Sequence, residues 1–312
     1  MARRLKILLT GSNGFVGGYF VKNFKIHDFE IYKFNRPDVN QLLDLYQEKK
    51  ETSSWQKHPK LKNKFDVIIH AASLPYLECE KDPQNAYLIN NIFTEILSDY
   101  CITNNSYFIF FSSVQVYGTS LNGTYNEETK ISPKTIYSIS KAKAEKYLLD
   151  KIKKNYLKGI ILRIGNIVGL PVKYNSKGWE LFSNSVVKEV SIKHQITIKN
   201  NPYIRRNFLS INLLINFLRK ILSEKANINF YIPKIINVTM GESTSLMEYA
   251  QLVAEKHNDI FNQKAIIKFD EKLIQEVPYS IIENQKLQNL FPNYRHFKID
   301  DDIKKMMKFL KG

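Results

Sequence analysis

The feature that most constrains the fold is an apolar strand that runs straight into a glycine-rich turn and then into a helix. "LKILLT" at residues 5 to 10 is followed by "GSNGFVGG", which holds four of the chain's 12 glycines. Glycines spaced three apart let the turn tighten, let backbone N–H groups approach a pyrophosphate at the helix N-terminus, and let the helix pack on the strand. The pattern predicts a dinucleotide-binding turn, the alternative being a loop rich in glycine for flexibility alone. The residues expected to contact the dinucleotide are Gly11, Asn13, Gly14, Phe15, Val16 and Gly17.

Short apolar runs alternate with longer amphipathic segments over the first 165 or so residues. The runs are "LKILLT", "FEIYKF", "FDVIIHAA", "YFIFFSS" and "GIILRI". Runs that are apolar on consecutive residues suit strands buried on both faces of a sheet. We therefore expect an α/β fold in which residues 1–165 form a dinucleotide-binding domain with a doubly wound parallel sheet, the Rossmann architecture.

The alternation ends after "NIVGLP". Residues 166–312 mix loops, strands such as "KIINVT", and helices such as "TSLMEYAQLVAEKH" and "DDIKKMMKFL". This mixture predicts a smaller C-terminal lobe, with segments at about 205–240 returning to the Rossmann domain. The chain shows no internal repeat and no low-complexity linker.

Composition limits the classes of function. The chain has 312 residues, 44% of them hydrophobic, and two cysteines, Cys79 and Cys101, which form no CxxC or disulfide-dense pattern. There is no apolar stretch of about 20 residues, and the first apolar run is too short for a signal peptide. The lysines behind the net charge of +16 are scattered rather than striped. We expect a soluble cytoplasmic protein with no membrane span, no nucleic-acid partner and no metal site.

A tyrosine and a lysine four residues apart occur in "YSISK", at Tyr137 and Lys141. This spacing sets two side chains one above the other on a helix. Tyr46 with Lys50 and Tyr147 with Lys151 repeat it, as chance allows in a chain with 18 tyrosines. The spacing alone is weak, and the neighbouring sequence must decide which pair is chemical.

The landmarks follow one another in a recognisable order. They are "GSNGFVG", "HAAS" at 70 to 73, "SSVQVYG" at 112 to 118, "YSISK", "LRIGNIVG" at 162 to 169, "RRNF" at 205 to 208 and "NVTMGESTS" at 237 to 245. The set resembles the extended short-chain dehydrogenase/reductase family, and more narrowly its nucleotide-sugar epimerases, dehydratases and ketoreductases. The resemblance spans nearly the whole chain, and it implies that the C-terminal lobe binds a nucleotide-diphosphate sugar.

The resemblance implies that Ser113, Tyr137 and Lys141 are the catalytic residues. It also implies that Tyr137 and Lys141 contact the cofactor. An ammonium one helical turn away favours the phenolate of a tyrosine whose ordinary pKa is about 10. Lys141 would also hold the nicotinamide ribose, and Ser113 would bind the substrate oxygen. The other two tyrosine–lysine pairs then become helix surface contacts.

The resemblance also implies roles for further residues, for which it gives weaker support. Ala71, Ala72 and Ser73 would run past the cofactor, with plain packing as the alternative. Ser112 would line the cofactor, and Asn90 would lie near the nicotinamide unless it makes only a helix contact. Asn166 and Arg206 match substrate positions, although Arg205 or Arg206 could simply be solvated. We expect His70 to be structural.

Departures from the family pattern narrow the activity. Related dehydratases carry an Asp-Glu pair after the catalytic serine, where this chain has Val114 and Gln115, and the Cys and His of fucose-type epimerase-reductases have no clear counterpart. The favoured function is NADPH-dependent reduction of a nucleotide-linked 4-keto-6-deoxy sugar for surface polysaccharide biosynthesis. The alternatives are an NAD-dependent nucleotide-sugar 4-epimerase and a non-catalytic dinucleotide sensor or RNA-binding relative.

The end of the second strand bears on the cofactor. NAD enzymes commonly place an acidic residue there, whereas this chain has Asn35 and Arg36, followed by Asp38 and Val39 in a segment expected to reach the adenine. We expect Asp38 to face away from a 2′-phosphate and Arg36 to bind it, which favours NADP over NAD. If Arg36 merely stacks on adenine, either cofactor fits.

The resemblance also implies a homodimer. Helices near 84 to 104 and 135 to 156 pair across a two-fold axis in many such proteins. Their apolar positions are also what a helix needs merely to cover its own sheet. These positions include Ile92, Ile96, Tyr100, Ala144 and Leu148.

Overall fold

The computed structural model describes residues 4–24, 29–119, 121–224 and 233–312. The chain divides into two compact units. The first holds the residues up to Thr119, Lys130–Arg163 and a segment that ends at Ile236, and the second holds the rest of the chain through Gly312.

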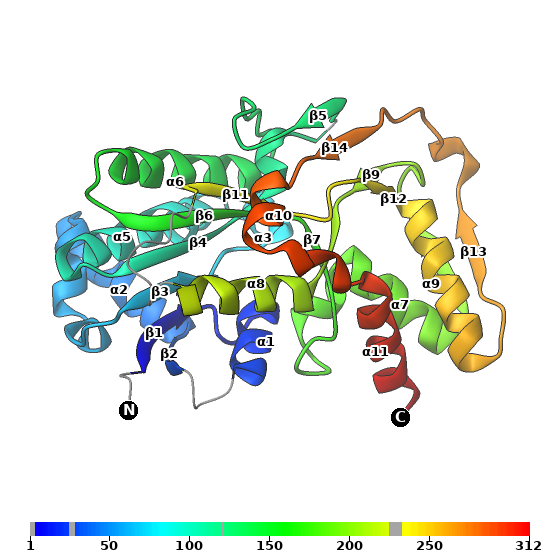
Figure 1. Ribbon diagram of the computed structural model, residues 1–312, viewed down its shortest axis with the longest axis horizontal. Helices are drawn as coiled ribbons and strands as arrows, with labels where there is room; N and C mark the ends of the chain where they lie inside the picture. Colours follow the sequence, from blue (N-terminus) through cyan, green and yellow to red (C-terminus); the bar gives the residue numbers. More distant parts are fainter. Residues whose placement is uncertain (1–3, 25–28, 120, 225–232) are drawn as a thin grey trace. The chain divides into compact units, whose positions relative to one another are not determined.

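The main sheet has six strands in the order β11-β6-β4-β3-β1-β2 (Figure 1). β1 pairs in parallel with β2 and with β3, and β3 pairs in parallel with β4. The strands are β1 Leu5–Thr10, β2 Phe29–Phe34, β3 Val67–His70, β4 Tyr107–Ser113, β6 Lys158–Ile164 and β11 Ile235–Val238. The chain order reverses at β1, and a reversal of this kind is where ligands bind in open α/β sheets. The predicted α/β class with a Rossmann-type sheet is confirmed.

Helices cover both faces of the strands in the first unit. α2, α5 and α6 share one apolar core with Leu8, Ile68 and Phe108, while α1 lies on the other side (Figure 1). The strand residues that alternate with these, such as Ile7 and Ile69, are also fully buried, as expected for a sheet covered twice. The helices of this unit are α1 Phe15–Asn23, α2 Arg36–Lys49, α3 Tyr76–Lys81, α4 Pro83–Tyr87, a π-helical turn Leu88–Ile92, α5 Phe93–Asn104 and α6 Ile136–Lys153.

The five apolar residues named for a dimer face lie in this core instead. Their exposed fractions do not exceed 3%, and they belong to the cluster that covers the sheet. They are Ile92, Ile96, Tyr100, Ala144 and Leu148. A dimer that uses these helices must therefore be built from other side chains, and the homodimer stays a prediction.

The second unit has its own core, formed by three helices that pack around short strands. α7, α9 and α11 supply Val187, Tyr249 and Met306, all of them fully buried. The helices are α7 Phe182–Lys193, α8 Ile211–Glu224, α9 Leu246–Phe261, α10 Gln285–Leu290 and α11 Ile299–Lys311. The short strands are β5 Gly123–Tyr125, β7 Asn166–Val168, β8 Gln195–Ile198, β9 Arg205–Arg206, β10 Phe208–Ser210, β12 Thr244–Ser245, β13 Ile266–Phe269 and β14 Ser280–Ile282.

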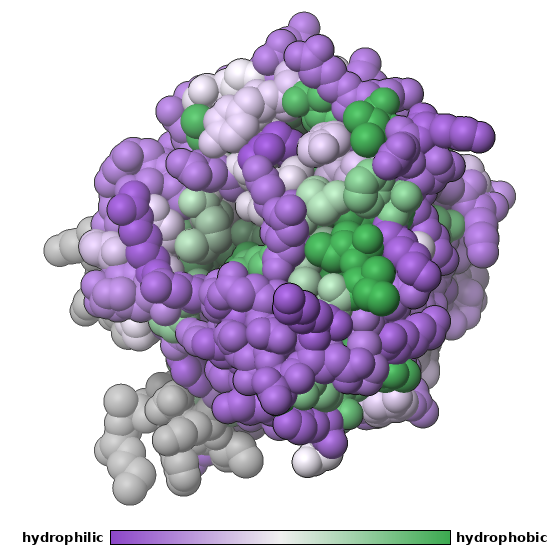
Figure 2. Space-filling view, turned by 90° about the vertical axis from the view of Figure 1, so that its right-hand side faces the viewer, coloured by the Kyte–Doolittle hydropathy of each residue, from purple (hydrophilic) through white to green (hydrophobic). Residues whose placement is uncertain are grey.

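The surface is mainly hydrophilic on the face drawn in Figure 2, where apolar side chains form separate patches among polar and charged ones. Among the described helices, none combines the length and the apolar character needed to cross a bilayer.

Candidate functional site

The turn after β1 has glycine where a side chain would not fit. Gly11 has a φ of +68°, and a Cβ there would stand 2.8 Å from the backbone nitrogen of Ala72. A Cβ on Gly17 would stand 2.3 Å from the carbonyl oxygen of Gly11. In the described structure no side chain caps the N-terminus of α1, which begins at Phe15. Its first N–H groups can therefore bind a phosphate, and the site fits a dinucleotide.

The end of β2 is tied to this turn. The Ser12 hydroxyl donates to the Asn35 side chain at 2.5 Å. The Asn35 N–H in turn donates to the carboxylate of Asp38 at 2.7 Å, and Lys60 pairs with the same carboxylate at 2.8 Å. Arg36, the first residue of α2, is exposed. The negative charge of Asp38 is thus held by a helix N-terminus and a lysine, while the Arg36 guanidinium is open to a ligand.

Val39 is buried, unlike the neighbouring cofactor candidate Arg36. Only 3% of it is exposed, and it packs in the core of the first unit. In this conformation its side chain serves α2 packing, and adenine contact at Val39 stays a prediction.

The segment that follows β3 is fixed by buried polar side chains. The Ala72 N–H donates to the Thr10 hydroxyl at 3.0 Å. The Asn90 side chain accepts from Ser73 at 3.1 Å and donates to the Ser140 hydroxyl at 2.9 Å. Asn90, which is 1% exposed, therefore joins the β3 loop to the helix that carries Tyr137.

His70 is structural in this arrangement. Its ring nitrogens lie 2.8 Å from the hydroxyl of Thr10 and 2.9 Å from that of Thr94. Burial first, and then the positive charge of Lys141, hold the pKa of His70 well below its usual range. A neutral imidazole with both nitrogens hydrogen-bonded is poorly placed to exchange protons with a substrate.

Ser113, Tyr137 and Lys141 come together between β4 and α6. Ser113 ends β4, and its side chain lies close enough to Tyr137 for a hydrogen bond. The Lys141 ammonium donates to the Phe111 carbonyl at 2.8 Å and lies 5.9 Å from the centre of the Tyr137 ring. α6 starts at Ile136, where a capping box between Thr135 and Ser138 fixes the first turn and so the direction of Tyr137.

Burial sets the protonation of this group. It raises the pKa of Tyr137 to about 12, against the opposing effect of the hydrogen bond with Ser113. It lowers the pKa of Lys141 to about 8, against the opposing effects of Cys79 and Glu145. At neutral pH the phenol therefore carries a proton to donate, and the lysine beside it is cationic.

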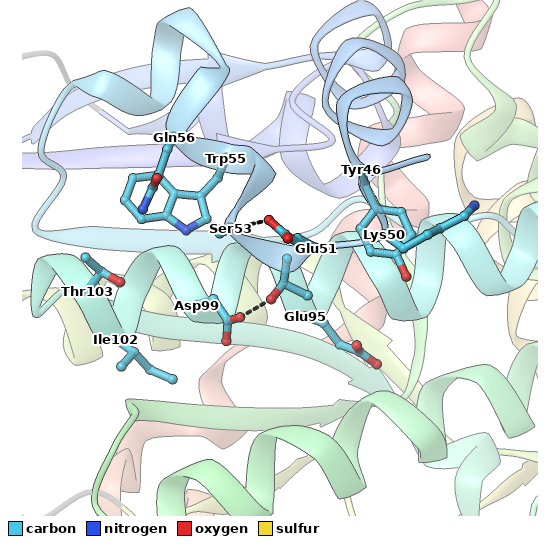
Figure 3. Close-up of a pocket in the computed structure, with 11 residues that line it drawn as sticks. Tyr46, Lys50, Glu51, Ser53, Trp55, Gln56, Glu95, Asp99, Ile102 and Thr103 are labelled. Carbon is cyan, nitrogen blue, oxygen red and sulfur yellow. Dashed lines mark hydrogen bonds between the residues drawn. The ribbon is translucent and has the colours of Figure 1, made fainter. Parts of the chain in front are cut away.

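The other two tyrosine–lysine pairs lie elsewhere in the first unit. The Tyr147 hydroxyl donates to Asp99 at 3.2 Å, and Lys151 lies 5.2 Å from its ring centre. Tyr46 and Lys50 line an open groove of about 550 Å³ between the α2 side and α5 (Figure 3). Among the described residues that line this groove, none is a predicted catalytic or cofactor residue.

Two of the three predicted substrate residues, Asn166 and Arg206, belong to the second unit. Asn166 begins β7 and donates its N–H to the Asn207 carbonyl at 2.7 Å. The Arg205 guanidinium lies 4.9 Å from the Tyr279 ring centre and donates to the Ser243 hydroxyl, whereas Arg206 is exposed. Of the two arginines, Arg206 is the one that is open to a ligand.

Sequence reasoning missed two buried charges beside the catalytic group, Glu145 and Arg163, which form an ion pair at 2.7 Å. The signal that could have found them is the spacing: Glu145 continues the four-residue step from Tyr137 to Lys141. Arg163 interrupts the apolar run "GIILRI", which is an uncommon place for a charge.

Similarity to known proteins agrees with this geometry. A D-erythronate dehydrogenase from Haemophilus influenzae is 27% identical over 196 residues, which cover 59% of this chain and 62% of that protein. A dTDP-4-dehydro-6-deoxyglucose reductase from Escherichia coli is 22% identical over 99% of both chains. The solved UDP-N-acetylglucosamine 4-epimerase of Methanobrevibacter ruminantium M1 has a TM-score of 0.78 at 18% identity, over 99% of this chain and 98% of that one.

A family model covers most of the chain. Residues 7–238 match the model of the NAD dependent epimerase/dehydratase family. The matched region contains the glycine turn, Ser113 and the Tyr137–Lys141 pair. The chain therefore belongs to the NAD-dependent epimerase/dehydratase family, whose members are nicotinamide-dependent enzymes of the extended short-chain dehydrogenase/reductase type.

Proposed function

We propose that the protein is an NADPH-dependent reductase of a nucleotide-linked 4-keto-6-deoxy sugar, acting in surface polysaccharide biosynthesis. The observation that carries the proposal is the contact between Ser113, Tyr137 and Lys141 at the end of β4. The E. coli relative that matches over 99% of both chains is a reductase of a dTDP-4-dehydro-6-deoxy sugar. The absence of an acid–base pair at Val114 and Gln115 argues against dehydration.

The residues have distinct roles in the proposed reaction. NADPH, when bound, supplies the hydride to the keto carbon. Ser113 donates a hydrogen bond to the keto oxygen and so favours the charge that develops there. Tyr137 gives that oxygen its proton, since its raised pKa keeps the phenol protonated at neutral pH. Lys141 stabilises the phenolate that remains and holds the ribose.

The second candidate is an NAD-dependent nucleotide-sugar 4-epimerase. It is favoured by the similarity of the fold to a UDP-N-acetylglucosamine 4-epimerase, with a TM-score of 0.78. The same three residues can run hydride transfer in both directions, so the site alone fits either reaction. The difference lies in the cofactor, because a net reductase consumes NADPH whereas an epimerase regenerates its own NAD.

The test is an assay with a panel of nucleotide-linked keto sugars and both reduced cofactors. We expect loss of NADPH absorbance with a 4-keto-6-deoxy sugar and formation of the corresponding deoxy sugar. Conversion of a nucleotide hexose into its 4-epimer without added reductant would favour the epimerase. Bound cofactor that turns over with no sugar would favour a non-catalytic dinucleotide sensor.

A further inference from the structure

A buried ion pair lies behind the catalytic residues. The Arg163 guanidinium contacts both carboxylate oxygens of Glu145, at 2.7 Å and 3.1 Å, and the two side chains are 4% and 1% exposed. Arg163 also donates to the Tyr117 hydroxyl at 2.9 Å and lies 4.9 Å from its ring centre. Charges of this kind are costly to bury, and replacing such a pair by apolar residues is often neutral or stabilising. Fold stability alone is therefore a weak reason for the pair.

Glu145 belongs to the same face of α6 as the catalytic residues. Tyr137, Lys141 and Glu145 are four residues apart, so they stand on successive turns of one face. Each contacts a different one of three consecutive residues at the end of β4. Tyr137 contacts Ser113, Lys141 contacts the Phe111 carbonyl, and Glu145 accepts from the Ser112 hydroxyl at 2.5 Å.

These contacts fix how α6 lies along β4. Arg163, on β6, holds the Glu145 carboxylate in place for the Ser112 contact. Arg163 also anchors Tyr117, in the 3₁₀ turn Val114–Tyr117 that leaves Ser113. One guanidinium thus links the helix with the tyrosine to the turn beside the serine.

We propose that the Arg163–Glu145 pair is a positioning pair for catalysis: through Ser112 and Tyr117 it sets where Tyr137, Lys141 and Ser113 stand relative to one another. The inference rests on the proposed hydride-transfer function of these three residues. The charge of Glu145 also supports the cationic form of Lys141. Within the described ranges, the other titratable groups that face Lys141 are Tyr137 on its own helix, Cys79 on α3 and His70 on β3.

The first experiment replaces Glu145 by glutamine, which keeps an acceptor for Ser112 and removes the charge. We expect kcat to fall by about 10- to 100-fold, with the dissociation constant for NADPH within about threefold of wild type. The alkaline limb of the pH profile of kcat should move to lower pH, because Lys141 loses a favourable anion. Asp150→Asn is the matched control, because it removes the same charge from the same helix, in an exposed pair with Lys154. It should change neither kcat nor the alkaline limb of its pH profile.

Ser112→Ala is the second variant. It tests whether the pair positions the catalytic residues even if Glu145→Gln does not fold. It keeps the ion pair and deletes its link to β4, so kcat should fall with little change in melting temperature. If Ser112→Ala, or a folded Glu145→Gln, keeps wild-type kcat per folded molecule with an unshifted pH profile, the pair is only structural and the inference is wrong.

Failure of the proposed function would be recognised separately. In that case wild type would reduce no keto sugar. The pH dependence of NADPH binding would then be measured instead of turnover, because a binding measurement needs no sugar substrate. Identical pH dependences in wild type and Glu145→Gln would overturn the inference, and a shift in the variant would support it.

Discussion

At the residue scale, Tyr137 differs by its partners from Tyr46 and Tyr147, which also have a lysine four residues further on. It contacts Ser113 and Lys141, whereas Tyr147 contacts a carboxylate and Tyr46 lines an open groove. Burial first, and then the charge of Asp99, raise the pKa of Tyr147, so its phenol is a poor proton donor even though Lys151 lies 5.2 Å from its ring centre.

We therefore expect Tyr137→Phe to abolish turnover while the affinity for the cofactor stays within a few-fold of wild type. The change deletes one hydroxyl and little packing volume. Steady-state kinetics and fluorescence titration with NADPH measure the two effects. Tyr147→Phe and Tyr46→Phe are the controls, and either of them inactivating the enzyme while Tyr137→Phe stays active would contradict the assignment.

Arg36 carries the prediction of cofactor preference. Its guanidinium is exposed at the start of α2, and the nearby carboxylate of Asp38 is paired with Lys60. We expect Arg36→Ala to reduce kcat/KM for NADPH by about 1.5–3 kcal/mol, roughly 10- to 150-fold, and to leave NADH almost unaffected. Lys33→Ala, which removes an exposed charge from β2 itself, serves as the control. Equal losses with both cofactors, or a wild-type preference for NADH, would favour the epimerase.

At the scale of elements, the strands of the main sheet could be predicted because they are buried on both faces and so appear as continuous apolar runs. The predicted strand "FDVIIHAA" is longer than β3, which ends at His70. The chain turns there because the Ala72 N–H bonds the Thr10 side chain instead of a neighbouring strand. A side-chain contact across 62 residues leaves no local sequence pattern.

The site was predictable to a similar degree. The glycine turn, Ser113, Tyr137 and Lys141 follow from motifs with fixed spacing along the chain. The pair of Glu145 and Arg163 does not follow from such a motif, because these two charged residues lie on different elements and come together only in the folded chain. The ion pair of Asp38 with Lys60 was missed for the same reason, because this lysine comes from the 3₁₀ turn Pro59–Lys62.

The start of α11 should make stability depend on pH. Asp302 is 1% exposed and accepts hydrogen bonds from Ser210 at 2.5 Å and Asn212 at 2.6 Å. Burial raises the pKa of Asp302 to about 7, against the opposing effect of the Ser210 hydrogen bond. Because the folded pKa lies above the unfolded one, the stabilisation is complete below about pH 4 and is lost as the pH rises to about 7.

Urea unfolding at pH 5 and pH 8 tests this. We expect wild type to lose about 2.5 kcal/mol of stability between these two pH values from this group, and Asp302→Asn to lose much less. Asp301→Asn, an exposed neighbour in the same turn, should behave like wild type. An unchanged pH dependence in Asp302→Asn would show that the carboxyl is ionised in the folded protein.

At the scale of the whole molecule, the open question is assembly. The buried apolar residues of α5 and α6 already pack against the sheet. An interface on these helices must therefore be formed by the side chains that face away from the sheet. Beside α6 lies Tyr87, the last residue of α4, which is 47% exposed, with the Lys143 ammonium of α6 5.9 Å from its ring centre. Leu77, on α3, is 67% exposed. Tyrosine is one of the residues that most often anchor an interface.

We expect a homodimer that buries this outer surface, although a net charge of +16 on each chain opposes the association. Because that repulsion is screened by salt, the dimer should be favoured at higher ionic strength. Light scattering should give twice the chain mass of 36.5 kDa, and Tyr87→Asp should shift the protein to monomer. Tyr156→Asp, at a residue 62% exposed beyond the end of α6, is the control and should leave the dimer intact. A species of 36.5 kDa at every protein and salt concentration would reject the dimer, and the active site would then have to work within a single chain.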